Sequence, residues 1–120
     1  MKILFTAILL VFCAALYAQK TILFESTDDV VKHATAELER ALNQPEGSLY
    51  KFSQKYHITG EYTMLLTLRN KGQVISVFVE DKKDGNILSQ NKLKDKLLEF
   101  QFSFKMPKNK DYKLSYTFKF

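Results

Sequence analysis

The sequence predicts a small α+β domain in which two helices pack on a small antiparallel sheet, in the order α-β-β-α-β. Three observations lead to this prediction. Apolar residues recur at helical spacing in residues 27–42 and 91–100, and they alternate with polar residues in 60–79 and 112–120, as in half-buried strands. No repeat or linker interrupts residues 19–120, so these residues should form a single domain.

The first helix should span residues 27–42. Residues 26–29 (Ser-Thr-Asp-Asp) offer an N-cap followed by acids in the first turn, where the helix dipole favours negative charge. Pro45 and Gly47 should end the helix, because the residue before a proline avoids the helical conformation. The expected buried side consists of Val30, Ala34, Leu38, Ala41 and Leu42.

Two stretches have a less regular pattern. Residues 21–24 are short, apolar and β-prone, and they form either a first strand or the lead-in to the helix. Residues 49–58 alternate aromatic and polar side chains imperfectly, so we expect an irregular extended stretch there.

A hairpin should follow. Residues 61–68 and 74–79 are the two strands, and residues 69–72 (Arg-Asn-Lys-Gly) provide a turn whose Asn and Gly tolerate positive φ. Residues 81–86 then read as a charged turn.

The second helix should begin with Ser89 as its cap and carry Leu93, Leu97, Leu98 and Phe100 on one side. Apolar and polar residues alternate again in residues 100–106 and in the final strand, 112–120. The final strand should place its aromatic side chains on the core face and Lys113 and Lys119 in water.

Residues 1–18 have the features of a secretory signal peptide. Lys2 is followed by a run of 15 residues, 3–17, that is almost entirely apolar, and Ala18 supplies a small residue at the cleavage position. The run is shorter than the roughly 20 residues that span a bilayer, so we expect cleavage after Ala18 and no stable membrane span afterwards. The protein should then be exported, to the periplasm or out of the cell.

Cleavage also removes Cys13, the only cysteine, which excludes disulfides and thiolate chemistry from the mature chain. Lipidation of Cys13 is disfavoured because Phe12 stands where a lipobox needs a small residue.

No motif points to catalysis. Asp29, His33 and Glu37 lie four residues apart on the first helix and could in principle ligate a divalent metal, but Lys32 and Arg40 flank them, as on an ordinary solvated helix face. The other histidine, His57, has no cysteine or acid cluster near it in sequence. With no Gly-x-Ser-x-Gly turn and no phosphate-binding loop, we expect a non-enzymatic protein without a metal or cofactor.

Charge is uneven along the chain. Residues 19–81 hold seven bases and nine acids, net −2, and residues 82–120 hold ten bases and four acids, net +6. Such a surface suits anionic lipids or nucleic acid. Because the aromatic residues of the last strand occupy the opposite phase from its lysines, and because export separates the protein from nucleic acid, we expect no nucleic-acid partner.

From Gly60 onward, the chain resembles the C-terminal domain of TonB-type energy transducers. The residues that carry the resemblance are Gly60 before a strand, Asn70-Lys71-Gly72 at the hairpin turn, residues 74–79, the helix 91–100, residues 104–107 (Phe-Lys-Met-Pro) and the terminal aromatic strand. The uncleaved membrane helix and the long proline-rich spacer of a transducer have no counterpart in this sequence. We therefore expect a stand-alone domain, 60–120 being its TonB-like part, that does not transduce energy itself.

The resemblance implies a sheet that meets an extended peptide edge-on. Its partner would be an envelope protein or an extended peptide, and either the last strand, 112–120, or the hairpin strand, 74–79, would offer the edge. The predicted binding residues are Ser76, Phe78, Lys113, Ser115, Thr117 and Lys119. The sequence leaves the oligomeric state open.

A cystatin-like inhibitor or a small lipid or ligand carrier is the alternative. A cystatin-like chain runs from its helix into uninterrupted strands, whereas here residues 91–100 should form a helix between the hairpin and the last strand. An apolar cavity beneath the first helix would favour a carrier.

Overall fold

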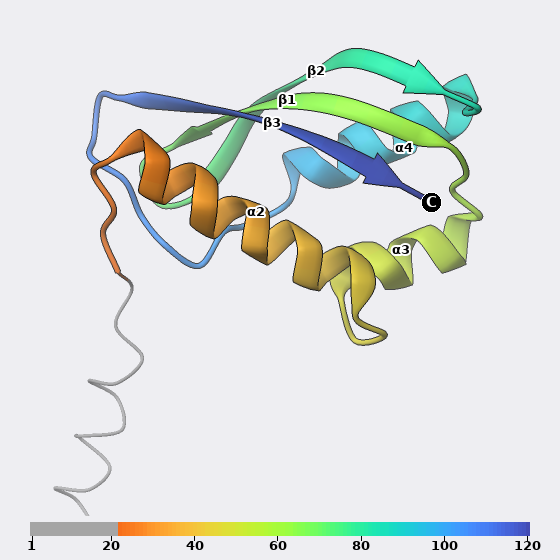
Figure 1. Cartoon of the computed structure of the whole chain (residues 1–120), viewed down its shortest axis with the longest axis horizontal. Coiled ribbons are helices and arrows are strands. Elements are labelled where there is room, and N and C mark those ends of the chain that lie inside the picture. Colours follow the sequence, from red (N-terminus) through yellow and green to blue (C-terminus); the bar gives the residue numbers. More distant parts are fainter. Residues whose placement is uncertain (1–21) are drawn as a thin grey trace, which may run out of the picture.

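Three antiparallel strands and three helices form the described part of this computed structural model, residues 22–120 (Figure 1). The strand order is β2-β1-β3, and the helices form a second layer on one face of the sheet (Figure 1). The predicted signal peptide and Ala18 lie outside the described residues. Within residues 22–120, no helix has the length and apolar character needed to cross a membrane.

The first helix confirms the sequence prediction. α2 spans Thr27–Asn43, and the Ser26 side chain caps it by accepting a hydrogen bond from the Asp29 N–H at 3.5 Å. Its inward side packs on the sheet, with Ala41 only partly buried. The buried residues of α2 are Val30, Ala34, Leu38 and Leu42.

The prediction of an extended stretch over residues 49–58 is wrong, and so is the count of two helices. Residues Ser48–Tyr56 form the helix α3. The spacing of Leu49, Phe52 and Tyr56 places them on neighbouring turns of a helix, and Leu49 is fully buried. The aromatic residues of this segment therefore follow the helical period of about 3.6 rather than the strand period of two. The segment has only nine residues, which is too short for the sequence to distinguish the two periods.

The hairpin has the predicted place but a longer second strand. β1 spans Glu61–Arg69 and β2 spans Gln73–Lys83, joined through Asn70 (φ 55°) and Gly72 (φ 80°). The charged turn predicted at 81–86 is therefore wrong for its first three residues, which pair with β1. Two register shifts in β2 absorb one extra residue each, which allows a charged segment to continue as a strand.

The helix between the hairpin and the last strand is α4, Ile87–Leu98. Its cap is Asn86, whose side chain accepts from the Ser89 N–H at 2.8 Å, so the prediction of Ser89 as the cap is wrong. Ser89 lies inside the first turn and is buried. Asn86 matches the N-cap preference as well as serine does, and its position three residues earlier extends the helix.

Residues 100–107 cross beneath the hairpin turn as an irregular segment. The Phe102 N–H donates to the Gly72 carbonyl at 3.0 Å, and the Met106 N–H donates to the Asn70 carbonyl at 2.6 Å. Leu23 forms a single parallel bridge with Lys105, so the segment before α2 is a lead-in rather than a strand.

The last strand, β3, spans Asp111–Lys119 and confirms the predicted phase. Tyr112, Leu114 and Phe118 are buried against the helices, whereas Lys113 and Lys119 are exposed. β1 therefore lies between β2 and β3, so that both strands predicted to offer an edge do lie at an edge of the described sheet.

Candidate functional site

All six predicted binding residues lie on the outer face of the sheet, opposite the helices. In the register of the strands, Ser76 and Lys113 flank Thr67 of β1, and Phe78 and Ser115 flank Leu65. All six are exposed, and Phe78 is the most apolar of them, with 64% of its surface accessible. The tertiary structure thus brings together residues from two strands that are about 40 positions apart in sequence.

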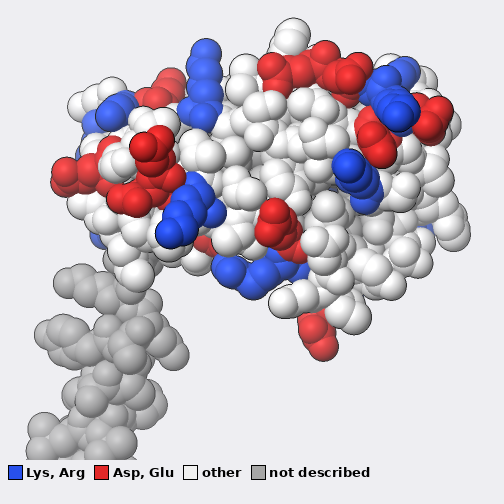
Figure 2. Space-filling model, in the orientation of Figure 1, with Lys and Arg blue, Asp and Glu red and all other residues white. Residues whose placement is uncertain are grey.

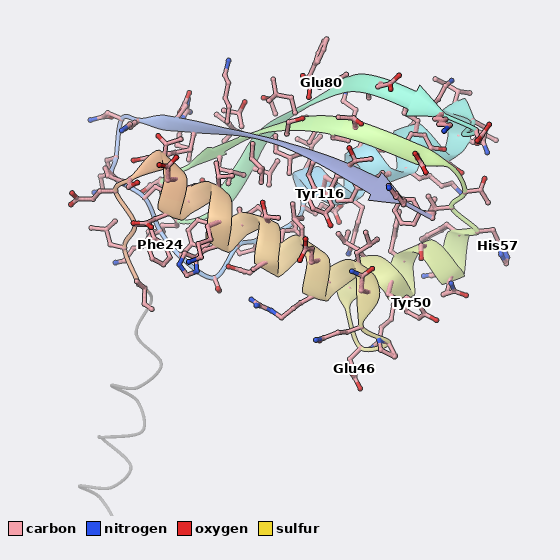
Figure 3. The ribbon with its side chains drawn as sticks, in the orientation of Figure 1. Phe24, Glu46, Tyr50, His57, Glu80 and Tyr116 are labelled. Carbon is pink, nitrogen blue, oxygen red and sulfur yellow. The ribbon has the colours of Figure 1, made fainter. Side chains whose placement is uncertain are left out.

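Hydrogen bonds tie this outer face together across β1. The Ser115 hydroxyl donates to Oε1 of Glu80 at 2.5 Å, which bridges β3 and β2, and Glu80 projects from the outer side of β2 (Figure 3). The hydroxyl groups of Thr63 and Thr117 are 2.9 Å apart. Lys119 pairs in register with Glu61.

The backbone of β3 distinguishes the two edges. The Phe120 N–H donates to the Gly60 carbonyl at 3.0 Å, so even-numbered residues of this strand point their backbone groups toward β1. Because successive residues of a strand point to opposite sides, the N–H and C=O groups of the odd-numbered residues face the open edge. These residues are Lys113, Ser115, Thr117 and Lys119.

The two predicted residues of β2 face the other way. Leu66 pairs with Leu114 of β3, so its neighbours Leu65 and Thr67 direct their backbone groups to β2, where they meet Phe78 and Ser76. The backbone groups of Ser76 and Phe78 therefore belong to the β1–β2 ladder. Only their side chains are free to bind.

The β3 edge is also the more regular one. Its pairing with β1 runs over nine residue pairs without a register shift, and none of its backbone groups bonds to a second strand within residues 22–120. β2 carries two register shifts, and its first residue, Gln73, forms an antiparallel bridge with Gln101. Bulges and covered ends are the devices by which natural sheets block edge pairing, so β3 is the more open of the two edges among the described residues.

Beneath the β3 edge lies α2. Tyr116 points down between the sheet and this helix (Figure 3), and burial, followed by the nearby negative charge of Glu39, raises the pKa of its phenol. The Tyr112 hydroxyl donates to the Glu25 carbonyl at 2.6 Å. On the face shown in Figure 2, a broad uncharged area is bordered by acidic and basic side chains, several of which lie over α2.

Two of the three residues weighed as metal ligands, His33 and Glu37, have other partners. The His33 ring stacks on Phe24 with 4.1 Å between the ring centres, and the Glu37 carboxylate accepts from the N–H and the hydroxyl of Ser103, both at 2.9 Å. His57 ends α3 in a left-handed conformation and lies at the surface, at the far end of the molecule from Phe24 (Figure 3). Among residues 22–120, no group of three potential ligands is close enough to hold a metal ion.

Sequence reasoning missed a groove between α3 and α4. It has a volume of about 420 Å³, and its lining combines lysines with aromatic rings. The groove requires α3, which the sequence did not predict. The signal that could have revealed it is the matched pair of lysines four residues apart in each helix, Lys51 with Lys55 and Lys92 with Lys96.

No protein-family model, no curated protein and no solved structure matches this chain. The class that the structure defines is a small α+β domain with three antiparallel strands and three helices in its described part.

Proposed function

We propose that this protein is an exported binding module that captures an extended peptide segment of a cell-envelope protein as a fourth strand beside β3. The observation that carries the proposal is the row of outward-facing backbone groups of Lys113, Ser115, Thr117 and Lys119 on an edge without bulges. In strand addition, main-chain hydrogen bonds supply affinity, and alternate side chains supply selectivity.

The side chains beside this edge give the proposed site a chemical preference. Lys113 and Lys119 stand near the two ends of the outer row, so acidic residues at matching positions of the guest strand are favoured. Guest side chains on the other face would meet α2 and the half-buried Tyr116. Each new backbone hydrogen bond contributes about 0.5–1.5 kcal/mol.

The proposal agrees with the resemblance of residues 60–120 to TonB C-terminal domains, without implying energy transduction. Two features favour it over the alternatives. α4 lies between β2 and β3, which departs from the cystatin-like order. The inward side chains of α2 at Val30, Ala34 and Leu38 have no accessible surface, so side chains fill the space beneath this part of the helix.

The test is selection of nine-residue peptides from a displayed random library, followed by binding to two variants. Ser115→Pro removes an outward N–H while leaving the hydrogen bonds to β1, whereas Ser115→Ala removes only the hydroxyl. We expect selected peptides to retain binding to Ser115→Ala and to lose about tenfold or more with Ser115→Pro.

Amide hydrogen exchange provides the second readout. Peptide binding should slow exchange at the amides of Lys113, Ser115, Thr117 and Lys119 and leave β2 unchanged. Equal peptide binding by both folded variants, or protection confined to another surface, would contradict the proposal.

A further inference from the structure

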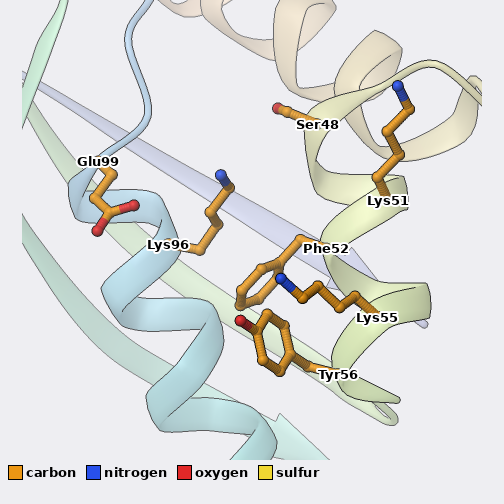
Figure 4. A pocket seen from close by; sticks show the side chains of 7 residues that line it. All are labelled: Ser48, Lys51, Phe52, Lys55, Tyr56, Lys96 and Glu99. Atoms are coloured by element: carbon orange, nitrogen blue, oxygen red, sulfur yellow. The ribbon is translucent and has the colours of Figure 1, made fainter.

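The groove between α3 and α4 is lined by Ser48, Lys51, Phe52, Lys55 and Tyr56 from α3 and by Lys96 and Glu99 from the end of α4 (Figure 4). Its volume of about 420 Å³ lies within the range of small-molecule sites. It lies on the helical layer, and its lining shares no residue with the β3 edge.

Lysines of both helices lie over the two aromatic rings that line this groove, and one of them, Lys92, stands outside the lining. Lys55 and Lys92 place their Nζ atoms 5.2 Å and 4.6 Å from the centre of the Tyr56 ring. Lys96 places its Nζ atom 5.8 Å from the centre of the Phe52 ring, and the two rings lie 4.9 Å apart. Lysines of two separate helices thus lie close to the same pair of aromatic rings.

Glu99 offsets only part of the positive charge of this cluster, and no lysine of the cluster forms an ion pair with a described residue. Among the described residues, the only ion pair joins Arg69 and Asp111, at the end of β1. Three lysines and Glu99 give the lining a net charge of +2, and Lys92 lies just outside it, over the Tyr56 ring. Each helix also carries two lysines four residues apart, a spacing at which like charges destabilise a helix slightly.

The lysines and aromatic rings of the groove favour an anionic ligand with an organic group. The negative faces of the Phe52 and Tyr56 rings attract the ammonium groups and repel anions, so an anion would bind on the ammonium side. A phosphomonoester carries about −1.5 to −2 charges and three acceptor oxygens, which suits several lysines better than a singly charged carboxylate. The remaining volume has room for an organic group against the edges of the rings.

We propose that the groove between α3 and α4 binds a phosphomonoester, with Lys55 and Lys96 holding the phosphate and Phe52 and Tyr56 contacting the organic group. The phosphate belongs either to a soluble ester or to the headgroup of a lipid. This site is separate from the proposed peptide edge and does not depend on it.

The experiment titrates the folded chain with phenyl phosphate and, separately, with phosphatidylcholine vesicles that contain phosphatidic acid, a lipid phosphomonoester. We expect saturable binding to at least one probe, with a dissociation constant for phenyl phosphate of about 1 mM or below if the ester is soluble. Binding to vesicles alone would assign the site to a lipid headgroup. Binding to neither probe would overturn the proposal.

Matched controls separate the site from general charge effects. Lys55→Gln/Lys96→Gln should weaken binding by about tenfold. Lys82→Gln/Lys110→Gln should not, although it removes the same charge and although Lys110 also lies over a tyrosine ring, 4.9 Å from the centre of Tyr112. Equal weakening by both double variants would overturn the proposal.

Benzoate tests the phosphate assignment, because it presents the same ring with a singly charged carboxylate. It should bind about tenfold or more weakly than phenyl phosphate where the latter binds. For the lipid arm, vesicles with phosphatidylglycerol, a phosphodiester, replace phosphatidic acid at equal surface charge. Binding that did not distinguish the phosphomonoester from its control would contradict the proposal. Circular dichroism checks the fold, and Lys96→Gln alone replaces Lys55→Gln/Lys96→Gln if that double variant fails to fold.

Discussion

The guanidinium group of Arg69, the last residue of β1, forms a two-pronged pair with Asp111, the first residue of β3, with Nε–Oδ1 at 2.7 Å and Nη2–Oδ2 at 3.0 Å. The two residues face each other in the strand register. The hydrogen bond to Arg69 lowers the pKa of the Asp111 carboxyl below its usual value of 3.8. The pair joins the two strands where β3 begins.

This pair predicts a pH dependence of stability. Because the folded pKa of Asp111 is depressed, the stabilisation is present above pH 3.8 and is lost as the pH falls through the folded pKa. Asp111→Asn should therefore lower the urea midpoint slightly near neutral pH and leave it unchanged in strong acid. Both side chains are substantially exposed, so added salt should also reduce the difference. A difference that persisted in acid would contradict the role of the charge.

Loss of the Tyr62 hydroxyl should destabilise the fold more than loss of the Asp111 charge. This hydroxyl donates to the Thr59 carbonyl at 2.5 Å and accepts from the Asn86 N–H at 3.1 Å, so it links the start of β1 to the cap of α4. Tyr62→Phe leaves the Asn86 donor without this partner and should lower the free energy of unfolding by about 1–3 kcal/mol. Chemical denaturation measures the change. The exposed Tyr50 provides the control Tyr50→Phe, which should be near neutral.

The hairpin turn depends on Gly72, which has a φ of 80°. A Cβ atom there would lie 2.6 Å from the Phe102 carbonyl oxygen and 2.7 Å from that of Phe104. Gly72→Ala should therefore destabilise the fold by about 1–3 kcal/mol or more, through backbone strain and displacement of the segment beneath the turn. Thermal unfolding checks this. Asn70→Gly in the same turn should change stability by only about 0.5 kcal/mol or less.

The direction of the backbone N–H groups predicts that a proline in β2 and a proline in β3 destabilise the fold to different extents. Ser76→Pro removes an N–H that points to β1, whereas Ser115→Pro removes one that points to the open edge. Ser76→Pro should cost about 1–3 kcal/mol more in unfolding free energy than Ser115→Pro. Equal destabilisation would show that the β3 edge is not open as described. This comparison tests the sheet independently of any ligand.

The spacing of apolar residues along the chain predicted a helix or strand correctly where the element was long and its period unambiguous. α2, β1 and β3 follow from the spacing of their apolar residues, and so does the placement of Lys113 and Lys119 on the outer face. The same reasoning failed for α3, because nine residues with three aromatic rings fit both periods. The same reasoning also predicted too early an end for β2, because a run of charged residues in an exposed edge strand resembles a turn.

The sequence by itself determined the α+β class, the phase of the last strand and the residues available on its outer face, since each depends on a repeat along the chain. Only the tertiary structure decided that β1 lies between the other two strands and that Ser115, but not Ser76, turns its backbone to the open edge. It also decided that Lys55 and Lys96 meet across one groove. These features depend on which distant segments pair and pack, and such pairing is set by burial of the whole core rather than by any local pattern.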